Sequence, residues 1–152
     1  KQAQPTHFSQ VVRLVKFWAQ RIKRENDSFR FKSFMIEMIL SRLCDKGLDF
    51  SDYPEALQHF FTYIARNNMR ERIVFSDYYN PTTVGSFSES VQIIDPVNAK
   101  NNVGRLYSAA QADAIVDAAL QAGEAIDAAL AAPTKQEPVY YWQKVFGSTF
   151  QV

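Results

Sequence analysis

The sequence predicts a mainly α-helical bundle of about four to five helices with one short two-stranded β element. Three observations carry this prediction. Apolar residues recur at steps of three and four along most of the chain, one segment is dominated by alanine, and β-prone runs are confined to one region. With 152 residues, of which 47% are hydrophobic and 14% aromatic, the chain is long enough to close one core, so residues 1–152 are expected to form a single domain.

The first predicted helix covers residues 6–25. One of its faces carries apolar side chains at helical spacing and is expected to be core: Phe8, Val11, Val12, Val15, Trp18, Ala19 and Ile22. A neighbouring face carries a largely cationic stripe: Arg13, Lys16, Gln20, Lys23 and Arg24. Residues 1–32 hold eight Lys and Arg against two Asp and Glu, so this element is the expected contact for an anionic partner. A solvated lysine-rich surface is the alternative interpretation of the stripe.

The second predicted helix covers residues 33–46 and is apolar nearly all round, as a central buried helix would be. Ser33 is placed to cap its N-terminus and Gly47 to end it. Its polar residues form a single line: Ser33, Glu37, Ser41 and Asp45. Glu37 therefore either faces a cleft or solvent, or must find a buried partner.

A third helix is predicted between a capping-box-like start at Asp52 and Glu55 and an end at residues 67–68. Beyond it, residues 73–75 and 91–94 are short β-prone runs. They lie about 16 residues apart, so two short strands joined by a long loop are expected rather than a tight hairpin.

The fourth predicted helix covers residues 103–132, with Asn101 and Asn102 as its caps, and 12 of the 27 residues from 106 to 132 are alanine. Its expected packed side is marked by Ile115, Ala119, Ala122, Ile126 and Leu130. The segment 139–150 then carries six large apolar side chains and is expected to dock on the bundle: Tyr140, Tyr141, Trp142, Val145, Phe146 and Phe150.

A self-sufficient catalytic site is not expected from this sequence. It contains no phosphate-binding loop, no glycine-rich dinucleotide motif and no nucleophile elbow. Its one cysteine, Cys44, and two histidines, His7 and His59, have no standard zinc spacing, so no metal site and a reducing, cytoplasmic compartment are expected. We expect neither a membrane span nor a signal peptide. Because the chain opens at Lys1 rather than at a methionine, it is interpreted as a piece of a longer protein.

Three segments in a fixed order, followed by a closing one, point to a known family. They read RLVKFW at 13–18, SFMIEMI at 33–39, IDPVNAKNNV at 94–103 and YWQKVFG at 141–147. Together they resemble the C-terminal helical lobe of the oligoadenylate synthase and cGAS-like nucleotidyltransferases, particularly the bacterial CD-NTases, the CBASS-type cyclic oligonucleotide synthases of antiphage defence. The resemblance implies an oligoadenylate-synthase C-terminal-like fold. It also implies that the metal-binding acids belong to an N-terminal catalytic lobe that is absent from this chain.

The resemblance assigns roles residue by residue. It implies that Lys16, with Arg13 beside it, contacts the triphosphate of the donor nucleotide. Ser33 and Phe34 match the segment that holds the donor base, where Phe34 replaces the more familiar tyrosine and keeps a ring face for stacking. Glu37 is a candidate contact for a neighbouring base or a basic side chain. The turn residues are expected to be architecture more than chemistry: Asp95, Asn98 and Asn102.

The implied function is nucleotide binding by one lobe of an enzyme that makes cyclic di- or oligonucleotides from nucleoside triphosphates, with ATP as the expected nucleotide. Magnesium is expected in the intact enzyme, with ligands outside this chain. Expected partners are the catalytic lobe and a regulatory protein or nucleic-acid activator, but no membrane. One alternative is a helical module that binds an acidic protein or nucleic acid through residues 13–24 and Arg66, Arg70 and Arg72. A second is a purely structural lobe without nucleotide binding.

Overall fold

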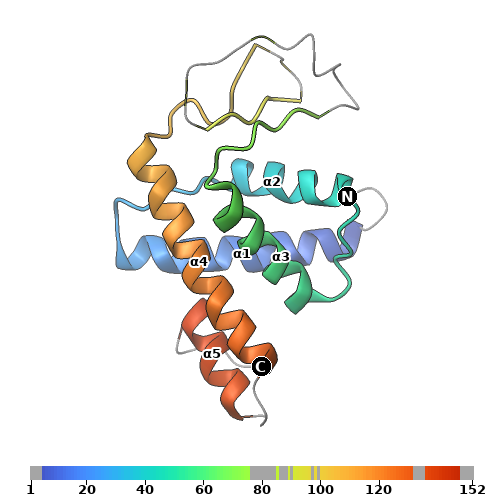
Figure 1. The fold of residues 1–152 in the computed structure, drawn as a ribbon, viewed down its shortest axis with the longest axis vertical. Helices are drawn as coiled ribbons and strands as arrows, with labels where there is room; N and C mark the ends of the chain where they lie inside the picture. Colours follow the sequence, from blue (N-terminus) through green and yellow to red (C-terminus); the bar gives the residue numbers. More distant parts are fainter. Residues whose placement is uncertain are drawn as a thin grey trace.

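Five helices make up most of the computed structural model, which describes residues 5–75, 85, 89, 91–96, 98, 100–131 and 136–147. They are α1 (Pro5–Glu25), α2 (Ser33–Asp45), α3 (Tyr53–Asn67), α4 (Ala109–Ala131) and α5 (Gln136–Phe146). In Figure 1, α1 and α2 run across the molecule, α4 crosses them steeply, and α5 lies beside the C-terminal half of α4. The mainly α-helical bundle predicted from the sequence is confirmed. Among the described helices, none is both long and apolar enough to cross a membrane.

The core is aromatic and centres on Trp18, which is only 1% exposed. Its ring centroid lies 4.7 Å from that of Phe61 on α3, and 6.1 and 6.2 Å from those of Phe29 and Phe31 in the segment between α1 and α2. Edge-on contacts of this kind add to the energy of burial. The predicted core face of the first helix is therefore confirmed, and it fixes the segment that precedes α2.

The two ends of α2 differ from each other in how well the sequence predicted them. Gly47 ends the helix as expected: it has a φ of 94°, its N–H donates to the carbonyl of Cys44 at 3.0 Å, and Leu48 N–H donates to the carbonyl of Leu43 at 3.0 Å. The N-cap prediction for Ser33 is wrong, because Lys32 has the extended capping conformation and Ser33 is the first helical residue. Lys32 is fixed there by its N–H, which donates to the Tyr107 hydroxyl at 2.7 Å.

Helix α3 begins and ends as the sequence predicted. The Asp52 carboxylate accepts a hydrogen bond from Glu55 N–H at 3.1 Å, and Asn68 closes the helix in the left-handed conformation. Just beyond it, Glu71 lies 3.1 Å from the ammonium of Lys46 and 3.5 Å from the guanidinium of Arg42. These ion pairs tie the segment after α3 to the C-terminal end of α2.

The expected two-stranded element is shorter than predicted in the described residues. Ile73 pairs with Ile93 in a parallel bridge, and Ile94 pairs with Asn102 in an antiparallel one. The Asn102 side chain replaces part of a regular ladder: its Oδ1 accepts from Ile93 N–H at 2.8 Å, and its Nδ2 donates to the Val91 carbonyl at 2.7 Å. Single bridges therefore stand where two short strands were expected.

The start of α4 was predicted six residues too early, because Asn102 is occupied with the 91–94 segment and caps no helix. The cap is Ser108, whose Oγ accepts from Gln111 N–H at 3.1 Å while Gln111 Oε1 accepts from Ser108 N–H at 3.0 Å. Leu130, predicted on the packed side, is 51% exposed. The buried face of α4 consists instead of Ala112, Ile115, Ala119, Ala122, Ile126 and Ala129.

The C-terminal segment docks as α5, through Val145 and Phe146, which are 1% and 2% exposed. Tyr140 points outward with 56% exposure, while Tyr141 and Trp142 are half-buried. Phe150, which belonged to the same prediction, lies outside the described residues.

Candidate functional site

A hollow of about 160 Å3 opens between the C-terminal half of α1 and the start of α2. Its polar lining is strongly cationic: Lys16, Gln20 and Lys23 from α1, and Arg30, Lys32 and Ser33 from the segment that enters α2. Phe29 and Phe31 also line it, and the same two rings pack on Trp18, so one wall of the hollow belongs to the hydrophobic core. We call this the cationic hollow.

Lys16 lies at the cationic hollow with its ammonium paired. Lys16 Nζ is 3.1 Å from Glu37 Oε1, and the two side chains are 30% and 40% exposed. Glu37 follows Ser33 by four residues, so both lie on one face of α2, one turn apart. The sequence left open whether Glu37 faces a cleft or finds a partner, and the structure gives it both partial exposure and a partner.

Arg30 is the cation that sequence reasoning missed. Its guanidinium carbon lies 5.1 Å from the centre of the Tyr107 ring, and its Nε is buried without a hydrogen-bond partner in the structure. A buried donor in this state is costly. Arg30 has no helical periodicity with the α1 stripe, so the sequence pattern gave no signal for it.

Tyr107 holds this part of the site in place from the far side. Its ring supports Arg30, and its hydroxyl accepts from Lys32 N–H at 2.7 Å. Burial raises the pKa of Tyr107, although the Lys32 hydrogen bond and Arg30 act in the opposite sense. The phenol therefore stays neutral at physiological pH and serves as an acceptor.

The N-terminus of α2 also contributes positive potential to the cationic hollow. Its capping position, Lys32, offers no side-chain hydrogen bond to the first turn, whose leading N–H groups have no partner within a helix. Lys32, Ser33 and Ile36 line the hollow, so the positive end of the helix dipole lies against it. Helix N-termini with this environment favour bound anions.

Phe34 and Arg13 lie outside the walls of the cationic hollow. Phe34 is 46% exposed in the first turn of α2, and Arg13 is exposed on α1, one turn before Lys16. The structure thus brings Lys16, Ser33 and Glu37 together, and leaves the Phe34 ring in solvent beside them. Stacking by Phe34 and phosphate contact by Arg13 stay predictions.

The turn residues Asp95, Asn98 and Asn102 all make hydrogen bonds within residues 91–104. Asn101 Nδ2 donates to Asp95 Oδ2 at 3.0 Å, and Asn98 Oδ1 accepts from Lys100 N–H at 3.1 Å. Asn102 is 2% exposed, and its side-chain amide forms hydrogen bonds with backbone groups. This turn leads directly to Tyr107 and so to the cationic hollow.

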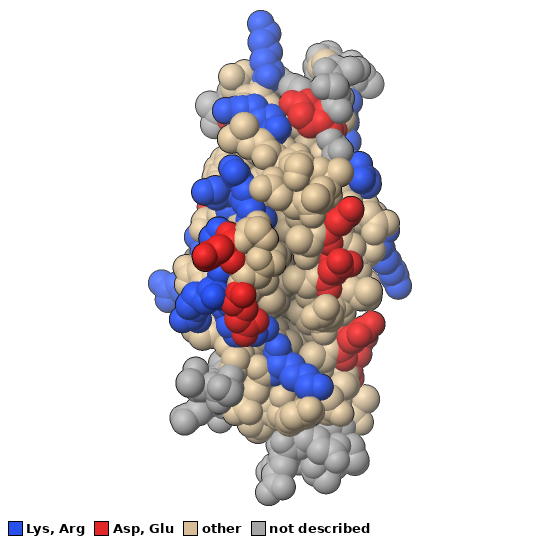
Figure 2. Space-filling view, turned by 90° about the vertical axis from the view of Figure 1, so that its left-hand side faces the viewer, with Lys and Arg blue, Asp and Glu red and all other residues tan. Residues whose placement is uncertain are grey.

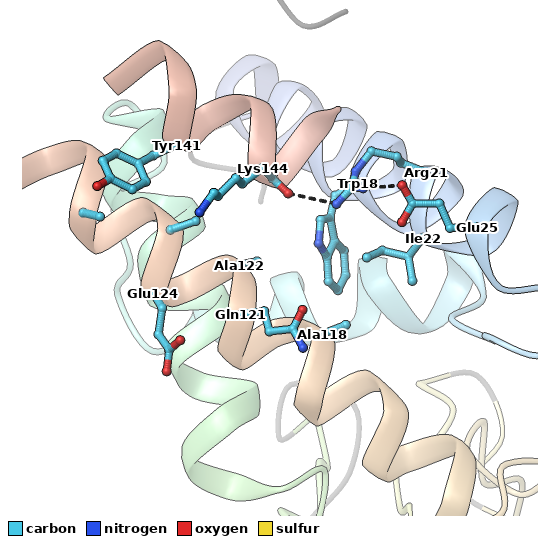
Figure 3. A pocket seen from close by; sticks show the side chains of 12 residues that line it. Trp18, Arg21, Ile22, Glu25, Ala118, Gln121, Ala122, Glu124, Tyr141 and Lys144 are labelled. Carbon is cyan, nitrogen blue, oxygen red and sulfur yellow. Dashed lines mark hydrogen bonds and ion pairs between the residues drawn. The ribbon is translucent and has the colours of Figure 1, made fainter. Parts of the chain in front are cut away.

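A second hollow of about 580 Å3 lies between α1, α4 and α5 (Figure 3). Arg21 on its wall is already engaged: it donates to the carbonyls of Val145 and Lys144, each at 3.0 Å, and pairs with Glu25 at 2.9 Å. These carbonyls belong to the last turn of α5, so Arg21 caps that helix. Glu124 adds an acid to the wall, and the larger hollow is therefore less suited to an anion than the cationic hollow.

Charge is divided across this side of the molecule. In Figure 2 acidic side chains line the right-hand edge of the face, while most basic ones lie on the left of an uncharged strip, with further acidic side chains among them. Helix α4 carries four exposed acids and no Lys or Arg: Asp113, Asp117, Glu124 and Asp127. Among the described residues, no group of three or more His, Cys, Asp or Glu side chains is placed to hold a metal ion.

No protein-family model matches the chain, but individual proteins do. The chain is 62% identical over 151 residues to the cyclic AMP-AMP-AMP synthase of Escherichia coli strain MS 115-1. The matched region covers 99% of this chain and 47% of the synthase. The chain is 28% identical over 149 residues to the CBASS oligonucleotide cyclase CdnC of E. coli strain KTE188, covering 98% of this chain and 44% of that protein.

Over its whole length the chain is similar to one part of known CBASS oligonucleotide cyclases. The structure of E. coli MS115-1 CdnC with ATP matches it with a TM-score of 0.95 and 62% identity, over 100% of this chain and 48% of that one. The structure of the same CdnC in complex with HORMA-deltaN gives the same values. The chain thus spans about half the length of the CBASS cyclases it matches.

Proposed function

We propose that the protein carrying this chain is a nucleotidyltransferase that joins nucleoside triphosphates into a cyclic oligonucleotide, and that this helical lobe holds the donor nucleotide. Similarity to CBASS oligonucleotide cyclases over nearly all of this chain supports the reaction class. The cationic hollow carries the assignment of the lobe, because Lys16, Arg30, Lys32 and the N-terminus of α2 converge on one small space.

The ligand that fits this charge pattern is a polyphosphate. Lys16 supplies a compact ammonium on a flexible stem, and Arg30 a rigid fork of donors supported by Tyr107. Ser33 adds a hydroxyl in the first turn of α2. Phe34 offers an exposed ring one residue further on, and stacking on a base is worth about 1–3 kcal/mol. ATP is the nucleotide we expect, since a CdnC of the family was solved with ATP.

In nucleotidyl transfer a ribose hydroxyl attacks the α-phosphate of the donor and pyrophosphate leaves. Cations that hold the β- and γ-phosphates orient the donor and offset the charge that develops on the leaving pyrophosphate. Magnesium, which the intact enzyme is expected to use, finds no ligand set among the described residues. The roles we propose for the described residues of this chain are binding and orientation of the donor.

The remaining partners follow from the same proposal. We expect a catalytic lobe to form the other wall of the nucleotide cleft, and a regulatory protein or nucleic acid to control the enzyme. CdnC of E. coli MS115-1 forms a complex with HORMA-deltaN, which makes a protein regulator the first candidate. A cytoplasmic location and a role in antiphage defence complete the proposal.

The test is ATP binding by the protein as its gene encodes it, measured by calorimetry with Lys16→Ala against wild type. Loss of one charge-assisted contact is expected to weaken binding about tenfold. Lys100→Ala is the control, because Lys100 is an exposed turn residue that does not line the cationic hollow. Equal affinity of Lys16→Ala and wild type would contradict the assignment. Salt-sensitive binding of any polyanion, without preference for triphosphates, would instead favour a helical interaction module.

A further inference from the structure

The Lys16–Glu37 pair places a carboxylate where the proposed function needs a phosphate. Lys16 Nζ and Glu37 Oε1 are 3.1 Å apart, at the side of the cationic hollow that α1 and α2 share. A carboxylate at this distance partly neutralises the ammonium and repels any anion that approaches it. The best-placed lysine of the site is therefore already occupied.

We propose that Glu37 is a competing counter-ion, which holds the Lys16 ammonium in the empty site and is displaced by the triphosphate of the donor nucleotide. This inference rests on the proposed function, and it assigns to Glu37 a positioning role that lowers nucleotide affinity. Glu37 touches Lys16 rather than the reacting phosphate.

The exposure of the pair makes such an exchange feasible. With side chains 30% and 40% exposed, neither partner is locked by packing, and exposed pairs of this kind are weak. A triphosphate carries several negative charges against one on the carboxylate, so it outcompetes Glu37 for the ammonium. Glu37 then turns into solvent at little cost, because its side chain is already 40% exposed.

Another ion pair in the protein lacks these properties. Glu71 is 24% exposed and binds two cations at the C-terminal end of α2: Arg42 at 3.5 Å and Lys46, the residue that follows the helix, at 3.1 Å. It joins two segments of the fold and borders the far end of α2 from the cationic hollow. Glu37 holds one cation, and that cation is the one assigned to the nucleotide.

The experiment compares Glu37→Gln with wild type in the protein as its gene encodes it, with ATP and inorganic tripolyphosphate as ligands. Both ligands are expected to bind roughly two- to fivefold more tightly to the variant, which is the range for an exposed ion pair. The variant site also loses one negative charge, so its affinity is expected to fall more steeply with added salt. The control is Glu25→Gln, which breaks the 2.9 Å pair with Arg21 at the other hollow and is expected to leave both affinities unchanged.

Two further variants separate the possible outcomes. In a Lys16→Ala background, Glu37→Gln is expected to give a smaller gain, since only the repulsion between the carboxylate and the ligand remains to be removed. Weaker or unchanged binding by Glu37→Gln, with thermal unfolding at the wild-type temperature, would overturn the counter-ion role; weaker binding would show that Glu37 supports the bound nucleotide. If Lys16→Ala alone leaves ATP binding unchanged, the proposed function fails as well, so the two failures are distinguishable.

Discussion

Replacing Tyr107 by phenylalanine removes one oxygen from the support of the cationic hollow and leaves the ring under Arg30 in place. The lost acceptor is the one that Lys32 N–H uses at 2.7 Å. Tyr107 is 5% exposed, so water reaches the vacated position poorly. A typical hydrogen bond contributes about 1 kcal/mol net, and a donor left unsatisfied costs about 1–3 kcal/mol. We expect a loss of about 1 kcal/mol, because the N–H belongs to an exposed residue and regains part of its hydration.

The measurement is the free energy of unfolding from urea titrations, with the denaturant dependence unchanged. For a chain of this size, 1 kcal/mol corresponds to a fall of about 2–4 °C in melting temperature. Tyr140→Phe is the matched control, since Tyr140 is 56% exposed and loses the same atom in solvent. The Tyr107→Phe variant is also expected to bind ATP more weakly than wild type, because Lys32 and Ser33 lose their fixed position. Equal stability of the Tyr107 and Tyr140 variants would refute the supporting role of this hydroxyl.

Three other predictions concern the fold. Gly104→Ala is expected to cost about 1–3 kcal/mol in unfolding free energy, because the added carbon would lie 2.6 Å from the Val91 carbonyl oxygen. Ile126→Ala is expected to cost about 2–5 kcal/mol, whereas Leu130→Ala, at a position 51% exposed, is expected to change stability by less than about 0.5 kcal/mol; calorimetric melting compares them. Burial would raise the pKa of Glu71, but its interactions with Lys46, Tyr63 and Arg42 outweigh this and lower it. The carboxylate therefore stabilises the fold above its ordinary pKa of 4.5, and this contribution is lost as the pH falls through the lowered value. The free energies of unfolding at pH 7 and in acid are expected to differ less in Glu71→Gln than in wild type.

The sequence predicted those elements whose signals are local and periodic. The apolar face of α1 and the Asp52 cap of α3 depend on residues within a few positions of each other, and both are confirmed. The predicted start of α4 was wrong because Asn102 and Ser108 are equally good capping residues in isolation. Only the pairing of Asn102 with the 91–94 segment, a tertiary contact, decides between them.

In the cationic hollow, too, some residues could be predicted from the sequence and others depend on tertiary contacts. Lys16 and Ser33 were predicted because they match a family pattern, and the structure brings them to one space. Arg30 carries no such pattern, and its place depends on the ring of Tyr107, which lies 77 positions further along the chain. A residue fixed by so distant a partner has no signal in its neighbours. The buried, unpartnered Nε is a property of the folded chain alone.

The cationic hollow and the larger hollow differ in what their cations already do, and this difference decides which one is suited to a nucleotide. Arg21 in the larger hollow donates to two carbonyls and one carboxylate, so binding a phosphate there would uncap α5. In the cationic hollow, Arg30 has a buried donor without a partner and Lys16 has one half-exposed partner that can leave. Binding an anion therefore costs little at the smaller hollow and disrupts a helix end at the larger one. The volume of a cavity is a poorer guide to an anion site than the hydrogen bonds its cations would have to give up.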